Sequence, residues 1–181
     1  CVTSAEGGDA CFGTSGAITR LRRGHQQRVV TGLPSLAGKD GSSASGPSDV
    51  VVTGNGRWTA VIGLGNNPAV RSQLPRAGAR LGTVVTGTLH ANRTSVIADL
   101  ADYEARRDPD HLGVDSNPTA AVLTRGGLTV VDAGGNDLLR VHRTGRVSTL
   151  AVLQNRTAPA PFPGGPPVLP LQPVPTSVAI G

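Results

Sequence analysis

Short runs of Val, Leu, Ile and Thr recur along the chain, and each run is bounded by Gly, Asn, Asp or Pro. Runs of aliphatic and β-branched residues favour strands, and the bounding residues favour the turns between them. The pattern therefore predicts an all-β fold of short antiparallel strands. Helical composition is confined to residues 68–81 and 99–107, where we expect loops that contain a helical turn.

The same strand pattern occurs more than once along the chain. Gly, Thr, Val, Gly and Asn in the segment 53–66 recur in the segment 124–136 at an offset of 70 positions. A strand pair follows each copy, and residues 16–33 contain a similar pair one copy earlier. Four short strands in a repeat of roughly 40 to 50 residues are typical of a β-propeller blade. The sequence thus predicts a partial β-propeller with about two complete four-stranded blades and part-blades at each end.

The repeat divides the chain into successive parts of one incomplete propeller domain. The predicted parts are the end of a blade at 1–37, complete blades at 47–101 and 117–154, a proline-rich linker at 155–173, and the first strand of the next blade at 174–181. Because proline removes backbone donors and favours extended geometry, we expect the linker to follow the surface without pairing in a sheet. An open arc of blades exposes sheet faces at both ends, so we expect a fragment of a longer propeller.

Charge and composition argue against two classes of partner. The formal net charge is +5, but the 16 Arg residues and Lys39 are spread along the chain and form no basic run. Aromatic residues make up only 2% of the chain, so the stacking platform of nucleic-acid-binding proteins is missing. The longest apolar runs are far shorter than the roughly 18 residues that span a bilayer. We therefore expect neither nucleic-acid binding nor a membrane span.

Cys1 and Cys11 are the two cysteines of the chain. Their even count and short spacing favour a disulfide that closes a small loop, which is typical of a secreted protein in an oxidising compartment. Two free thiols, or a lipid attached to Cys1, are the alternatives. The chain contains no Met, and we expect any signal peptide to lie upstream of Cys1.

Polar residues at the predicted ends of inner strands are candidates for a binding site. Inner strands of a propeller converge on its axis, so side chains distant in sequence can meet there. The candidates carry carboxylate or carboxamide oxygens that suit a divalent cation such as Ca²⁺, and they are Asp49, Asn117, Asp132 and Asn136. Against this site, neither Glu6 nor Glu104 is on a predicted inner strand, and Ile62 stands at the position equivalent to Asp132. The alternative is that these Asp and Asn side chains stabilise turns.

The segment 108–115 is similar to the first half of a calcium-binding loop. It begins with Asp108 and has Gly113 at the sixth position, where a sharp turn is required. However, Leu112 occupies the fifth position, Thr119 occupies the twelfth, where a bidentate Glu belongs, and no flanking helices are predicted. We therefore expect an exposed acidic loop.

The chain lacks sequence motifs for nucleophilic catalysis and nucleotide binding. Its four histidines are isolated, without the His-x-His or His-x-x-x-His spacing that brings two imidazoles to one metal. Neither a Gly-x-Ser-x-Gly motif nor a glycine-rich phosphate loop occurs. We therefore assign no catalytic or cofactor-binding residue beyond the candidate cation ligands.

Several runs resemble sequences of the ScyD/ScyE family. They include residues 31–36, 62–65, 114–118, 132–141 and 174–179. The resemblance implies a secreted, NHL-like, six-bladed β-propeller for which no reaction is established. It also implies a distant relation to gluconolactonase-like propellers, which hold a metal with Glu, Asn and Asp side chains.

Two functions from different classes follow. We interpret the chain as a non-enzymatic binding or scaffold propeller that contacts an unknown ligand or protein through rim loops at 64–80 and 102–116. The alternative is a metal-dependent, gluconolactonase-like hydrolase or isomerase in which the candidate cation polarises a small metabolite. Because a fold does not define a reaction, we prefer the first interpretation.

Overall fold

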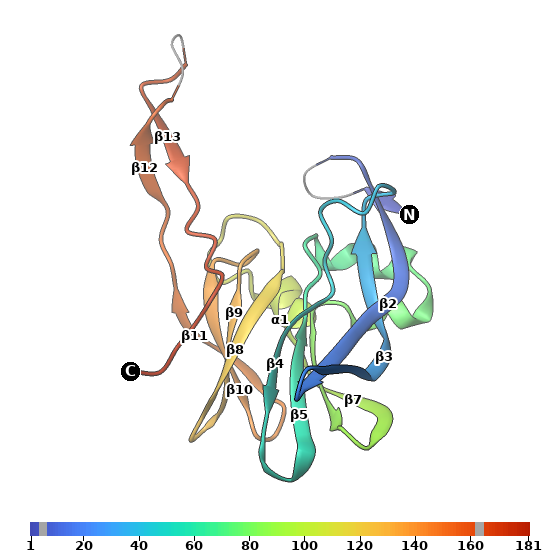
Figure 1. Ribbon diagram of the computed structural model, residues 1–181. Coiled ribbons are helices and arrows are strands. Elements are labelled where there is room, and N and C mark those ends of the chain that lie inside the picture. The colour runs from blue at the N-terminus through green and yellow to red at the C-terminus, as the bar shows by residue number, and fades with distance from the viewer. Residues whose placement is uncertain (4–6, 162–164) are drawn as a thin grey trace.

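The computed structural model describes residues 1–3, 7–161 and 165–181. Strands dominate these ranges and form three antiparallel sheets and a separate two-stranded hairpin (Figure 1). The prediction of an all-β fold is therefore confirmed. The described part of the chain does not close into a barrel or a ring.

The first sheet is a long hairpin with one short additional strand. Its strands are β1 (Val2–Thr3), β2 (Asp9–Arg22) and β3 (His25–Ala37), in the order β1-β2-β3. The turn between β2 and β3 consists of Arg23 and Gly24, both with positive φ, as the tight turns of twisted hairpins require. The predicted strand pair at 16–33 is thus confirmed within a longer hairpin. A disulfide joins Cys1 to Cys11 beside the β1–β2 pairing.

The second and third sheets are four-stranded meanders. The second contains β4 (Pro47–Val52), β5 (Arg57–Ile62), β6 (Thr83–Thr88) and β7 (Ala91–Asp99). The third contains β8 (Pro118–Thr124), β9 (Gly127–Asp132), β10 (Asp137–His142) and β11 (Val147–Val152). Both sheets therefore place their strands in chain order, as the repeat predicts.

The second sheet is buried on both faces. Trp58 and Ile62 of β5 lie in one apolar cluster with Leu33 of β3. Val61, the neighbour of Ile62 in β5, lies in a second cluster with Val130 of β9. Because successive side chains of a strand point to opposite faces, β5 is apolar at both sets of positions and packs between the other two sheets.

Equivalent contacts connect each meander to the segment that follows it. The Ser48 hydroxyl of β4 donates to the Pro118 carbonyl oxygen at 2.9 Å. The Thr119 hydroxyl of β8, one repeat later, donates to the Pro175 carbonyl oxygen at 3.3 Å. Ser48 and Thr119 each directly follow the first proline of a meander. Each thus bonds to the proline that begins the next segment, which is Pro118 for Ser48 and Pro175 for Thr119.

Residues 99–107 form more structure than the predicted helical turn. They include α1 (Leu100–Arg107), a two-turn helix that starts at an N-cap where the Asp99 side chain accepts a hydrogen bond from the Asp102 backbone N–H. Leu100 and Ala101 bury the apolar side of this short helix. Residues 68–81 contain only the 3-10 turns η2 (Pro68–Gln73) and η3 (Arg76–Arg80), and η1 (Gly54–Gly56) joins β4 to β5.

The proline-rich segment 155–173 pairs with itself, so the prediction of an unpaired linker is wrong. Strands β12 (Arg156–Pro159) and β13 (Val168–Leu171) form an antiparallel hairpin that projects from the sheets (Figure 1). Pro159 and Pro170 occupy alternate residue pairs of this hairpin. Backbone donors remain at the intervening pairs, which is why the prolines do not prevent pairing.

Residues 174–181 were expected to form the first strand of a further blade, but they carry no strand. An inner strand is stabilised by pairing with the second strand of its sheet, and no described segment provides that partner. The segment nevertheless begins beside β8, where the Pro175 carbonyl oxygen accepts a hydrogen bond from the Thr119 hydroxyl.

Candidate metal centre

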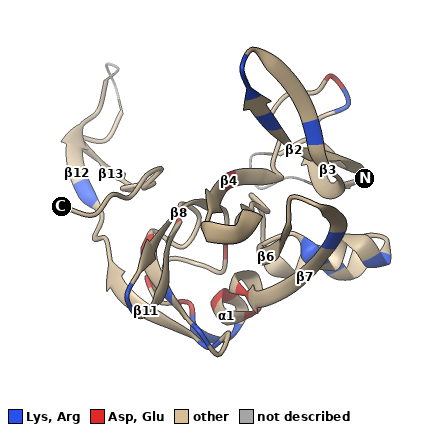
Figure 2. Ribbon diagram, turned by 60° about the horizontal axis from the view of Figure 1, so that its bottom comes forward, with Lys and Arg blue, Asp and Glu red and all other residues tan. Residues whose placement is uncertain are grey.

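Carboxyl groups gather where α1, the loop that follows it, and the turn between β9 and β10 meet. The groups come from the helix, from the loop 108–116 and from the ends of the two strands (Figure 2, acidic residues red). They belong to Glu104, Asp108, Asp110, Asp115, Asp132 and Asp137. This region is the candidate functional site.

The helix end folds the loop back over Glu104. Asp108 ends α1 in the left-handed conformation, with φ 40°, and its backbone N–H donates to the Glu104 carbonyl oxygen at 2.9 Å. A left-handed residue at this position reverses the chain direction after a helix. As a result, one carboxylate oxygen from each of Glu104, Asp108 and Asp110 lies within 4.8 Å of the other two.

Five carboxylate oxygens in this region are buried and accept no hydrogen bond. They are Glu104 Oε1, Asp108 Oδ1, Asp115 Oδ1 and both oxygens of Asp137. Glu104 is 1% exposed and Asp137 is 0% exposed, so water does not reach these atoms. Carboxylates that are buried without donors or cations destabilise a fold by several kcal/mol each, so an ion or protons must compensate them.

The pKa values of these groups are shifted by their environment. Burial, reinforced by the charges of Asp132, Asp108 and Asp110, raises the pKa of Glu104 to about 8. Burial, reinforced by Asp132 and Glu104, raises the pKa of Asp137 to about 9. Burial also raises the pKa of Asp115. Among the described residues, no Lys or Arg forms an ion pair with any of these carboxyl groups.

Asp132, a predicted cation ligand, already has a full set of hydrogen-bond donors. Its Oδ1 accepts from the backbone N–H groups of Asn117 at 2.6 Å, Gly134 at 3.1 Å and Gly135 at 3.2 Å. Its Oδ2 accepts from the Ser116 hydroxyl at 2.7 Å. Asp132 therefore fastens the β9–β10 turn to the start of β8.

The other predicted ligands are divided between two places. Asn136 lies beside Asp132, and its side-chain amide donates to Asp110 Oδ2 at 2.9 Å and accepts from the Val174 N–H at 3.1 Å. Asp49 lies at the junction of β4 and β8, where its Oδ2 accepts from the Ala121 N–H at 2.8 Å. The structure thus brings Asn117, Asp132 and Asn136 together but separates Asp49 from them.

The loop 108–115 differs from the exposed acidic loop that we expected. Its Asp side chains are half-buried, Asp108 and Asp115 each have one buried oxygen without a hydrogen-bond partner, and α1 directly precedes the loop. Glu104 supplies a carboxylate from within that helix, so a Glu after the loop is not required to complete an acidic set. The sequence contains a signal for this, because residues four apart on a helix lie on the same face, and Glu104 precedes Asp108 by four.

A surface depression leads to this region. It has a volume of about 350 Å³ and is lined by Asp110, Asp115, Asn136 and Gln172, among others. Two of these lining residues belong to the acidic group, so an ion or small solute can approach the carboxyl groups from solvent.

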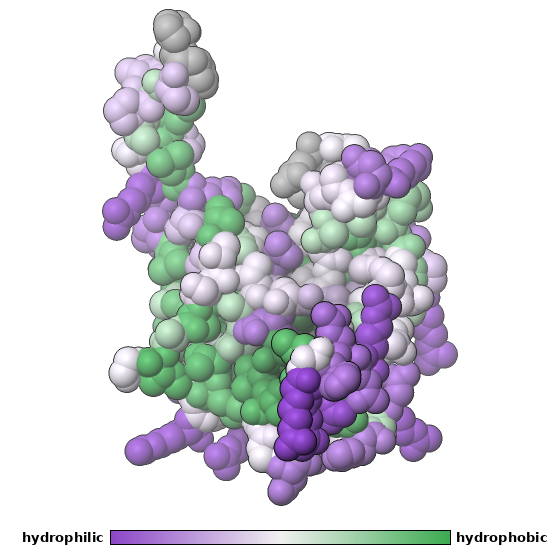
Figure 3. Space-filling view, viewed as in Figure 1, coloured by the Kyte–Doolittle hydropathy of each residue, from purple (hydrophilic) through white to green (hydrophobic). Residues whose placement is uncertain are grey.

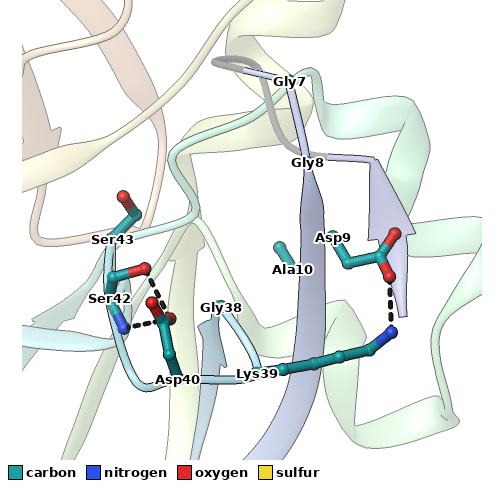
Figure 4. Close-up of a pocket in the computed structure, with 9 residues that line it drawn as sticks. All are labelled: Gly7, Gly8, Asp9, Ala10, Gly38, Lys39, Asp40, Ser42 and Ser43. Atoms are coloured by element: carbon teal, nitrogen blue, oxygen red, sulfur yellow. Dashed lines mark hydrogen bonds and ion pairs between the residues drawn. The ribbon is translucent and has the colours of Figure 1, made fainter.

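A second depression, of about 550 Å³, lies near the start of β2 and has its charges matched internally (Figure 4). The Lys39 ammonium forms an ion pair with Asp9 Oδ2 at 2.7 Å, which lowers the pKa of Asp9. The Asp40 carboxylate accepts hydrogen bonds from the backbone N–H and hydroxyl of Ser42. These exposed pairs satisfy one another, so this depression is a weaker candidate than the acidic region.

The chain was compared with known families and proteins. No family model, no curated protein and no solved structure matches it. Among the described residues, no helix is both long and apolar enough to cross a membrane. The fold and site themselves define an all-β protein of repeated antiparallel meanders with a buried acidic region at one junction.

Proposed function

We propose that this chain contributes consecutive blades to a secreted β-propeller of the ScyD/ScyE type, which acts as a non-enzymatic binding or scaffold domain. The observation that carries the proposal is the repeated contact of Ser48 with Pro118 and of Thr119 with Pro175. A contact that recurs between equivalent residues supports a common step between successive units. Repetition of one step around an axis generates a propeller.

Packing on both faces of the second sheet supports this arrangement. In a two-layer sandwich each sheet has one inner face and one face in solvent. The second sheet instead contributes Trp58 to a cluster with the first sheet and Val61 to a cluster with the third. Blades of a propeller pack in this way against a neighbour on each side.

The sheets also diverge from their first to their last strands. Asp49 of β4 binds the backbone of Ala121 in β8, so the first strands of the two meanders are adjacent. In Figure 2, β7 and β11 lie on opposite sides of α1. The helix binds both sheets, because the Leu100 N–H donates to the Gly82 carbonyl oxygen and the Tyr103 hydroxyl contacts Thr149 of β11. Adjacent first strands and separated last strands support a radial arrangement of the two sheets.

Apolar side chains on the first strands are exposed on one face (Figure 3, green, lower left). Val50 and Val52 of β4 and Leu123 of β8 belong to this set, and Val52 is 56% exposed. In a closed propeller the first strands of all blades surround one axis, and such a surface faces the equivalent surfaces of the other blades.

The two loops assigned to binding lie next to each other. Asn66 in the loop 64–80 forms a β-bridge with Ser116 in the loop 102–116, and the Gly65 N–H donates to the Ser116 carbonyl oxygen at 3.0 Å. Adjacent loops at the same edge of neighbouring sheets form a continuous surface, which suits binding of a protein or a large ligand. The Cys1–Cys11 disulfide supports a secreted location, since such bonds persist in oxidising compartments.

We place a metal-dependent lactone hydrolase second. Asp49 and Asp132 would have to polarise a substrate through a cation in that mechanism. Both carboxylates instead accept hydrogen bonds from backbone N–H groups, which is the arrangement of side chains that stabilise turns and strand junctions.

Two experiments test the proposal. An experimental structure should superpose β4–β7 on β8–β11 by a rotation about one axis near β4 and β8, and a two-layer sandwich would overturn the propeller. Glucono-1,5-lactone hydrolysis, followed with a pH indicator in the presence of Ca²⁺, Mn²⁺ or Zn²⁺, should not exceed the background rate. Metal-dependent turnover above this background that EDTA abolishes, and that persists in the surface control Asp102→Ala, would establish the enzymatic alternative.

A further inference from the structure

We propose that Glu104, Asp108 and Asp110 bind a single Ca²⁺ ion that joins α1 to the following loop. The proposal concerns residues other than the predicted cation ligands and does not depend on the propeller or on the family resemblance. It rests on two observations: the convergence of three carboxylates and the presence of buried, unpartnered oxygens aimed into the same region.

The distances between the carboxylates fit one ion. The three oxygens lie within 4.8 Å of one another. Ca²⁺ binds oxygen ligands at about 2.4 Å, so two ligands on opposite sides of the ion are about 4.8 Å apart. The observed spacing is therefore compatible with three oxygens that share one Ca²⁺.

The unpartnered oxygens indicate a cation more strongly than protons. Glu104 Oε1 and Asp108 Oδ1 are buried and accept no hydrogen bond from any described residue. A proton on one carboxyl group supplies one donor, which satisfies at most one neighbouring oxygen. A single divalent ion interacts with several oxygens at once and compensates two charges, so it accounts for the unpartnered oxygens of both Glu104 and Asp108.

The donor set selects Ca²⁺ among common divalent ions. All three groups offer oxygen, whereas Zn²⁺ sites in proteins usually include nitrogen or sulfur ligands. The nearest histidine in the sequence, His111, is exposed. Mg²⁺ requires a smaller octahedral shell and usually retains several waters, which a buried ligand such as Glu104 does not favour.

Neighbouring groups hold the ligands in place. The Asn136 amide donates to Asp110 Oδ2, and the Leu112 N–H donates to Asp110 Oδ1. Each oxygen of Asp110 retains a second lone pair for an ion. Asp110 and Asp115 line the depression of about 350 Å³ described above, which provides a route to solvent. The ion would thus connect the end of α1, the loop 108–116 and, through Asn136, the third sheet.

Calorimetry and thermal unfolding of the full chain test the site. After removal of metals with EDTA, titration with CaCl₂ should show one binding event per chain, at least about tenfold tighter than with MgCl₂. A hundredfold excess of Ca²⁺ over its Kd should raise Tm by about 5–10 °C. Absence of binding heat and of a Tm shift at 10 mM CaCl₂ would overturn the proposal.

Two variants and a matched control separate a ligand from a merely structural residue. Glu104→Gln should abolish the response to Ca²⁺, because an amide cannot supply the negative charge that the ion binds. Asp108→Asn changes a half-buried ligand and should also abolish the response. Asp102→Asn, on the same helix but paired with Arg106, should respond as the wild type does. A full Ca²⁺ response in Glu104→Gln or Asp108→Asn would contradict the assignment.

Discussion

Equivalent turns in the second and third sheets have the same backbone contact but different chemistry. The Gly63 N–H donates to the Gly46 carbonyl oxygen, and one repeat later the Ala133 N–H donates to the Asn117 carbonyl oxygen. Before these turns, the second sheet has Ile62, which packs in an apolar cluster, and the third sheet has Asp132, which collects four donors. One backbone position can thus be stabilised either by apolar packing or by a hydrogen-bonded carboxylate.

The length of chain after each turn explains the difference. Between β5 and β6 the chain makes a long excursion through η2 and η3, and Leu64, Val70, Leu74 and Leu81 of this excursion join the apolar cluster that contains Ile62. Between β9 and β10 only residues 133–136 intervene, and the backbone N–H groups of Gly134 and Gly135 donate to Asp132. A tight turn presents donors that need an acceptor, whereas a long loop supplies apolar cover.

Exchange of the two residues should have the largest effect. Asp132→Ile leaves the Ser116 hydroxyl and the backbone N–H groups of the turn without their acceptor, and should lower the free energy of unfolding by about 4 kcal/mol. Ile62→Asp places a carboxylate in an apolar cluster and should be at least as damaging. Urea denaturation measures both. Ile62→Leu, which conserves volume, is the control and should lose less than about 1.5 kcal/mol.

Replacement of Trp58 by Leu, its counterpart at position 128, should have an intermediate effect. Trp58 is fully buried in the cluster between the first two sheets, so the smaller side chain leaves a cavity. However, the Trp58 indole N–H is buried without an acceptor, and its removal offsets part of the loss. We expect a loss of about 2 kcal/mol in urea denaturation. An unchanged unfolding midpoint would mean that this cluster does not stabilise the fold.

Removal of metal should reveal a pH dependence that originates in the third sheet and α1. Burial and neighbouring carboxyl groups raise the pKa of Glu104 to about 8 and that of Asp137 to about 9, well above the values of an unfolded chain. Between the pKa values of the unfolded chain and these raised values, the folded state binds more protons than the unfolded state. The free energy of unfolding therefore falls as pH rises through this range. In EDTA, Tm should therefore decrease from pH 5 to pH 8.

Two comparisons check the origin of this pH effect. Glu104→Gln should flatten the profile, because one of the two titrating groups is gone. Saturating Ca²⁺ should oppose the decrease, since the ion binds the ionised carboxylates. A Tm in EDTA that rises from pH 5 to pH 8 would contradict the assigned direction of the shifts.

The smallest effects are expected at the repeated contact between units. Ser48→Ala removes a hydrogen bond of 2.9 Å and Thr119→Val removes one of 3.3 Å. Each should reduce the free energy of unfolding by about 1 kcal/mol or less, with the larger loss at Ser48, where the bond is shorter. Precise urea titrations with both variants would show whether the Ser48–Pro118 and Thr119–Pro175 contacts contribute similar free energies of unfolding.

The strands were predictable because their signal is local. Runs of Val, Ile and Thr between Gly and Asn defined both meanders. The repeat aligned Gly65–Asn66 with Gly135–Asn136 as equivalent positions, and this alignment needed no tertiary information. The β12–β13 hairpin was missed for a related reason. Proline content indicates an extended chain, but the alternate spacing that permits pairing depends on register, which composition does not reveal.

The acidic region was only partly predictable because its members come from different elements. Asp132 and Asn136 were identified because they lie at the ends of predicted inner strands, whereas the loop beginning at Asp108 was expected to be an exposed acidic loop despite its partial likeness to a calcium loop. Glu104 and Asp137 differ from other carboxyl groups of the chain because they are buried. Their burial depends on how α1 packs between two sheets, which the sequence does not reveal. The donors that occupy Asp132 are backbone groups, which have no signature in a sequence.

The helix α1 fills the widening space between the last strands of two sheets while their first strands stay in contact. The helix therefore acts as a spacer that holds the last strands of the two sheets apart. Removal of this insertion would leave that space unfilled and should bring the last strands of the two sheets closer together.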